Sequence, residues 1–274
     1  MRVAGCALVL ALLLSACSAQ ETPVSPEQTV TSDHRPPVSD LHTPTPEARS
    51  MDRTYPWHTG IVATTFWVGE IFDPKAADGS QVESAYDASW MQHYGGCDGR
   101  VVRHGRRSTC ETQRRTAANG WFPTDMRPRE NPFYLDVPFD DMNDPIAFRQ
   151  RCRVVPWAQD PGYRGHCRDR SFSYLKNRWV RIVGPVGRTC YGQVEDAGPG
   201  KYHDAAYVFG SHDARPANRR YGGAGMDVSP ALNGCLGFAA LNGDADRVSW
   251  SFVEAVDVPP GPWTRLVTRR GSSG

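Results

Sequence analysis

WVRIVGPVGRTCYGQVEDAGP, residues 179–199, contains two apolar runs separated by a turn that is rich in Gly and Pro. Val and Ile before such a turn, and Thr, Tyr and Val after it, predict a β-hairpin with strands at 179–183 and 189–195. The second run ends in an acidic corner, Glu195-Asp196-Ala197-Gly198-Pro199. The hairpin therefore brings two carboxyl groups to the end of a predicted strand.

A second informative stretch, Gly225-Met-Asp-Val-Ser-Pro-Ala-Leu232, places an Asp inside a short predicted strand over 225–228. Pro230 then suits the first turn of a helix over 230–236. A further helix is predicted over 144–152, with Asp144 as its cap. Additional strands are predicted at 60–68, 132–137 and 248–256. Because no long stretch has a helical period, we expect a single β-rich domain with few short helices.

Two segments that we do not expect to belong to the folded domain precede it in the sequence. Met1-Arg2, a brief apolar run and Leu14-Ser15-Ala16-Cys17 form a predicted export signal, too short for the roughly 20 residues of a spanning helix. Residues 18–55 are rich in Pro, Ser and Thr and predict a disordered tether. The barrel domain is then expected at 56–265 and a disordered tail at 266–274. Leu14-Ser15-Ala16-Cys17 resembles the bacterial lipobox, in which the Cys is lipidated and becomes the new N-terminus, so we expect a lipoprotein attached through Cys17. The alternative is a plain secretory signal that is cut nearby.

Six cysteines lie within the predicted domain: Cys97, Cys110, Cys152, Cys167, Cys190 and Cys235. An even set in an exported protein favours disulfides over a metal site. Many pairings are possible, and proximity favours Cys97–Cys110, Cys152–Cys167 and Cys190–Cys235. Such bonds would order the long Arg- and Gly-rich loops between the paired residues.

Four motifs together resemble one family of folds. The corner 196–199 and the Asp-Val-Ser at 227–229 resemble the Asp-x-x-Pro and Asp-Leu-Ser of the double-psi β-barrels of expansins, rare lipoprotein A and related endoglucanases. The segment 63–69 resembles their first strand and 131–139 their central strand. The resemblance implies an all-β fold, a six-stranded double-psi β-barrel with long disulfide-stapled insertions. It also implies a protein that acts on wall polysaccharide outside the cytoplasmic membrane.

Carried over by position, Asp227 stands where this family has its functional acid, with Asp196 beside it and Thr65 supplying a hydroxyl. Cleavage of a glycosidic bond needs a protonated carboxyl at the leaving oxygen, often with a second carboxyl about 5 Å away or further. Glu70, Glu195 and Asp196 are the available partners. A lytic transglycosylase needs only one acid/base, because the 6-hydroxyl of the sugar attacks. Asp227 is therefore the candidate acid that protonates the leaving oxygen, with Asp196 and Glu70 as its catalytic partners.

Each of these residues also has a purely structural explanation. Asp196 suits a hydrogen bond to its own Gly-Pro turn, and Asp227 suits a cap of the following helix. Glu70 suits a solvated position after a strand. Among the aromatic residues, Trp67 and Tyr191 are candidates for stacking on sugar rings, although most aromatic side chains belong to the core. Alternation along a strand leaves their facing direction open.

Other function classes find little support in the sequence. With 31 Lys and Arg against 30 Asp and Glu, the chain has no excess charge to favour nucleic acid. His203 and His212 lie near aspartates without a repeated metal-ligand spacing, so we expect neither metal nor cofactor. We expect a monomer that binds a wall glycan, peptidoglycan or a cellulose-like polymer, and cleaves or loosens it. The alternative is a non-catalytic, expansin-like binding or scaffold lipoprotein.

Overall fold

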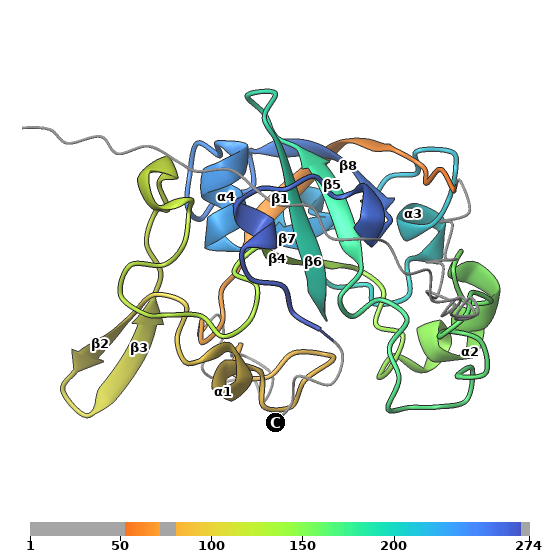
Figure 1. Cartoon of the computed structure of the whole chain (residues 1–274), viewed down its shortest axis with the longest axis horizontal. Helices are drawn as coiled ribbons and strands as arrows, with labels where there is room; N and C mark the ends of the chain where they lie inside the picture. Colours follow the sequence, from red (N-terminus) through yellow and green to blue (C-terminus); the bar gives the residue numbers. More distant parts are fainter. Residues whose placement is uncertain (1–52, 72–80, 270–274) are drawn as a thin grey trace, which may run out of the picture. The chain divides into compact units, whose positions relative to one another are not determined.

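Six strands form a closed barrel in the computed structural model, which describes residues 53–71 and 81–269 (Figure 1). The barrel strands are β1 (His58–Thr65), β4 (Tyr134–Val137), β5 (Trp179–Val183), β6 (Thr189–Ala197), β7 (Met226–Val228) and β8 (Arg247–Val253). They are ordered β1-β7-β4-β6-β5-β8 around the barrel. The expected mostly β fold with a closed six-stranded barrel is confirmed.

Helices are few and short within the described residues. They are α1 (Trp90–Tyr94), α2 (Pro145–Val154), α3 (Ala205–Val208) and α4 (Pro230–Leu236), with 3-10 turns at Ala117–Asn119, Tyr221–Gly223, Ala255–Asp257 and Pro262–Thr264. The predicted caps are in place for α2, where the Asp144 side chain accepts hydrogen bonds from two backbone N–H groups. None of the helices in the described part of the chain has the length and apolar character needed to cross a membrane.

The pairing of three strands brings three aspartates together. β4 lies between β6, to which it is parallel, and β7, to which it is antiparallel. In this register Asp136 of β4 is the partner of both Asp196 and Asp227. β1 runs parallel to β7 and sets Thr64 opposite Asp227. Residues far apart in sequence therefore meet at one end of these strands.

The barrel interior and helices α2, α3 and α4 share one large apolar cluster, which includes fully buried Trp157, Trp250 and Phe139. Helix α1 packs in a second, smaller cluster. Burial of each large apolar side chain contributes roughly 1.5–3 kcal/mol to folding. The Cys190–Cys235 disulfide joins β6 to α4, and the other two predicted disulfides, Cys97–Cys110 and Cys152–Cys167, are also present. The predicted pairing is confirmed.

Two expectations need correction. The segment between Cys97 and Cys110 is not a loop, because β2 (Arg100–His104) and β3 (Arg107–Glu111) pair as a separate two-stranded hairpin. The packed domain is also wider than 56–265. Tyr55 packs on the Trp157 ring at 5.7 Å, and buried Thr268 donates its backbone N–H to Gln193 at 3.0 Å. Composition alone hid these contacts, because each end contributes only a few packed side chains. Cys17 and most of the predicted tether lie outside the described residues.

Candidate functional site

A cleft of about 210 Å³ lies where β1, β4 and β7 meet the corner after β6. Its walls combine acids, hydroxyls and aromatic rings. The residues that line it include Thr64, Thr65, Glu70, Asp136, Gly198, Tyr202, Tyr221 and Asp227. Three of the predicted site residues, Asp227, Glu70 and Thr65, therefore share one cavity.

Asp136 and Asp227 form the centre of this cleft. The backbone N–H of Asp227 donates to Asp136 Oδ1 at 2.9 Å, and the Thr64 hydroxyl donates to the Asp227 carboxylate. Burial raises the pKa of Asp227 to about 6, partly opposed by the Thr64 hydrogen bond. Burial, and then the charges of Asp227 and Asp196, raise the pKa of Asp136 well above its usual range. At neutral pH the pair therefore holds a proton on the buried Asp136 while Asp227 is mostly ionised.

Glu70 is the third carboxyl of the cleft and is partly exposed. Its position is fixed by two backbone hydrogen bonds, from Glu70 N to Trp67 O at 2.9 Å and from Gln81 N to Glu70 O at 2.9 Å. Burial raises the pKa of Glu70 to about 8, and the charge of Asp227 adds to the effect. The interpretation of Glu70 as a merely solvated residue does not match this setting.

Asp196 lies next to the cleft without lining it. Its Oδ1 accepts hydrogen bonds from the backbone N–H of Ala85 at 2.7 Å and of Ala197 at 2.8 Å. Burial raises the pKa of Asp196 to about 7, against the lowering effect of these bonds. Asp196 therefore links the backbone at Ala85 to the corner after β6. Its charge also helps to raise the pKa of Asp136, which lines the cleft.

Helix α4 supports the floor of the site. Its cap is Ser229, whose hydroxyl accepts from Leu232 N at 3.2 Å, so the interpretation of Asp227 as the helix cap is wrong. From within α4, the Asn233 amide donates to Thr65 Oγ1 at 2.9 Å. Because that oxygen already accepts a bond, the Thr65 hydroxyl hydrogen is directed elsewhere.

The aromatic residues chosen from the sequence lie outside the cleft. Trp67 is buried against the Cys97–Cys110 disulfide and donates its indole N–H to Cys110 O at 2.9 Å. Tyr191 packs on Trp263 in the main core, with ring centroids 5.2 Å apart. The cleft is lined instead by buried Phe66 and by Tyr202 and Tyr221, which are 44% and 58% exposed. Tyr202 follows β6 and Tyr221 lies in the 3-10 turn before β7, so neither is in a strand where alternation could indicate its direction.

Asp136 is the main residue that the sequence interpretation missed. It stands in the apolar run Phe133-Tyr-Leu-Asp-Val137, all of which is buried. A lone acid in such a run is a signal in itself, because a buried carboxyl is costly unless it is paired or protonated.

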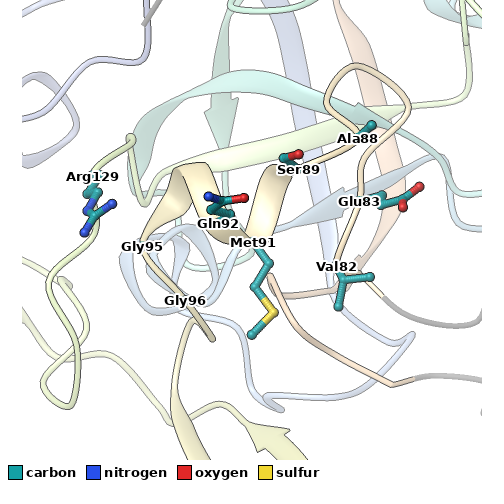
Figure 2. Close-up of a pocket in the computed structure, with 9 residues that line it drawn as sticks. All are labelled: Val82, Glu83, Ala88, Ser89, Met91, Gln92, Gly95, Gly96 and Arg129. Atoms are coloured by element: carbon teal, nitrogen blue, oxygen red, sulfur yellow. The ribbon is translucent and has the colours of Figure 1, made fainter. Parts of the chain in front are cut away.

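A second cavity of about 610 Å³ is lined by residues of α1 and of the segments on either side of it (Figure 2). Gln81 lines the cleft, while Val82 and Glu83 line the larger cavity, so one short segment borders both. In Figure 2, α1 lies between Glu83 and Arg129. The larger cavity has one carboxyl and no buried acid pair among its lining residues. Within residues 53–71 and 81–269, no cluster of His, Cys, Asp or Glu is arranged to hold a metal ion.

The close approach of Gly198 to Asp136 gives a first prediction. A Cβ atom at Gly198 would lie 2.5 Å from Asp136 Oδ2. We expect Gly198→Ala to lower the free energy of unfolding by about 1–3 kcal/mol, measured by urea denaturation. In an Asp136→Ala background the same substitution should cost much less, because the clashing atoms are gone. Equal costs in both backgrounds would contradict this contact.

Comparison with known proteins adds no identity to this geometry. No protein-family model matches the chain, and no curated protein matches it either.

Proposed function

We propose that this chain is a lipid-anchored, extracytoplasmic protein with a double-psi barrel whose cleft binds wall polysaccharide and cleaves its glycosidic bonds. The observation that carries the proposal is the meeting of Asp227 and Glu70 in one cleft, with Asp136 buried beneath them. Two carboxyls of different pKa in one cavity are what an acid/base cleavage of glycosides requires. The order of the strand motifs along the sequence is the support for the double-psi assignment.

The two partly buried acids have complementary roles in this proposal, and Glu70 takes the acid role that the sequence motif indicated for Asp227. Glu70, whose pKa is about 8, is protonated at neutral pH and donates its proton to the leaving glycosidic oxygen. Asp227, whose pKa is about 6, is ionised and takes the proton of the attacking hydroxyl, from water or from the 6-hydroxyl of the sugar itself. The bond from the anomeric carbon to the leaving oxygen breaks as the new carbon–oxygen bond forms. Asp136, protonated and buried, keeps the negative charge of the pair on Asp227.

The remaining walls suit a sugar polymer. The exposed rings of Tyr202 and Tyr221 offer flat faces to sugar rings, and the Thr65 hydroxyl offers a donor. Tyr221 has a φ of 52°, a conformation that costs an aromatic residue energy and is concentrated at functional sites. The larger cavity, which borders the same 81–83 segment as the cleft, is where we place further rings of a long chain.

The test is incubation of the purified protein with peptidoglycan and, separately, with cellulose, followed by mass spectrometry of the soluble products. Anhydro-sugar ends identify transglycosylation, and reducing ends identify hydrolysis. Sedimentation with the insoluble glycan measures binding. Binding without product release would favour the non-catalytic, expansin-like function, and the absence of both would exclude a glycan-directed role.

The pKa values of the two acids predict a bell-shaped pH profile. We expect kcat/KM to rise through about pH 6 as Asp227 ionises and to fall through about pH 8 as Glu70 loses its proton. Initial rates of product release across this range measure the profile. Glu70→Gln should lower the rate and remove the alkaline limb. A profile in which Glu70→Gln keeps both limbs would exclude Glu70 as the proton donor.

A further inference from the structure

The β2–β3 hairpin carries a concentration of positive charge that the glycan cleft does not use. Arg100, Arg103, Arg106 and Arg107 are all exposed on it. Its acid, Glu111, lies 3.5 Å from His104. In the part of the chain that the structure describes, none of these four guanidinium groups forms an ion pair. On a chain with nearly balanced charges, this hairpin is therefore a local cationic surface.

The base of the hairpin is firmly held while its turn is exposed. The Cys97–Cys110 disulfide closes the base, and Asp98 beside it is 1% exposed. Asp98 accepts hydrogen bonds from Arg115 at 2.8 Å and from the Tyr134 hydroxyl at 2.7 Å, which joins the hairpin to β4. In Figure 1, β2 and β3 reach away from the barrel strands. The barrel thus presents the turn, residues 103–107, as a projecting tip.

We propose that this tip docks on a membrane surface of anionic phospholipids. Arg103, Arg106 and Arg107 lie within five consecutive residues around the turn. Arg107 pairs with His104, so Arg103 and Arg107 extend from opposite faces of the hairpin, with Arg106 in the turn between them. A surface that meets the end of the tip can therefore contact all three long side chains. Guanidinium groups bind phosphate oxygens in pairs of hydrogen bonds, which suits lipid headgroups. Residues 103–108 contain no large apolar side chain, so the contact is electrostatic and does not insert into the bilayer. The predicted lipid at Cys17 would hold the domain near such a surface.

The test uses residues 49–274, which form one compact unit containing the described core. Sedimentation is measured with vesicles of phosphatidylcholine alone and of phosphatidylcholine mixed with phosphatidylglycerol. We expect binding to the anionic vesicles only, weakened by added salt. The triple variant R103Q/R106Q/R107Q should bind them about 100-fold more weakly.

The matched control is R149Q/R153Q/R164Q, which removes the same charge from other exposed positions. We expect it to bind close to the unmodified level, and circular dichroism checks that both triple variants are folded. Equal loss in both variants would overturn the proposal, since net charge alone would then explain binding. Binding to soluble polyphosphate but not to anionic vesicles would also overturn it, in favour of a soluble polyanion. None of these outcomes depends on glycan cleavage.

Discussion

Asp227→Asn is expected to reduce glycan product release by about 10²–10⁴-fold, because it removes the carboxylate that accepts the proton of the attacking hydroxyl. The amide can still accept the Thr64 hydrogen bond, and the backbone bond from Asp227 N to Asp136 is unaffected. Glycan binding should therefore persist while cleavage is lost. Mass spectrometry of released fragments measures cleavage, and sedimentation with the glycan measures binding.

Asp125→Asn is the matched control for this substitution. Asp125 is exposed, lies outside the cleft and accepts a hydrogen bond from the Gln113 side chain. The change therefore removes one aspartate carboxylate at a position that has no role in the proposed reaction. We expect full activity from it. If Asp227→Asn releases fragments at the unmodified rate, the cleft is not catalytic and the binding function is favoured. If it also loses glycan binding, Asp227 contacts the substrate in the ground state.

Local chemistry explains which parts of the fold the sequence could predict. The hairpin around 184–187 and the two capped helices depend on neighbouring residues, and all are present within a few positions. β6 runs on to Ala197, two residues beyond its predicted end, because Asp136 and Val137 of β4 pair with Asp196 and Ala197. β1 ends at Thr65, three residues early, where its pairing with β7 stops. Such limits are set by partner strands, which one sequence does not reveal.

The site was predictable only in part, for a similar reason. Asp227 and Glu70 follow from motif and residue type, and both line the cleft. Asp136, and not Asp196, lines the cleft beside Asp227. This depends on the strand register, because β4 is the strand that pairs with both β6 and β7. Likewise, Trp67 is covered by the Cys97–Cys110 disulfide, whose two cysteines lie far from Trp67 in the sequence. Tertiary contacts decide which side chain of a candidate set faces the ligand.

The buried carboxyls also make stability depend strongly on pH. Asp136 has a pKa raised well above its usual 3.8, and burial raises the pKa of Asp196 to about 7. A carboxyl with a raised pKa in the folded state contributes stability that is fully present below its unfolded pKa, near 4. That contribution is lost as the pH rises towards the folded pKa, by up to about 1.4 kcal/mol per pH unit and group. The free energy of unfolding should therefore fall between about pH 4 and about pH 8.

Asp136→Asn should reduce this pH dependence, because the amide resembles the protonated acid and its Oδ1 can still accept from Asp227 N. Urea denaturation at about pH 5 and about pH 8 should show that the variant gains stability over the unmodified protein mainly at the higher pH. His58 acts in the opposite sense, because burial lowers its pKa to about 4, and its contribution is lost as the pH falls below about 6.5. This effect is common to both proteins and cancels in their difference. If that difference is the same at both pH values, Asp136 is ionised in the folded protein, and the charge of the cleft does not reside on Asp227 alone.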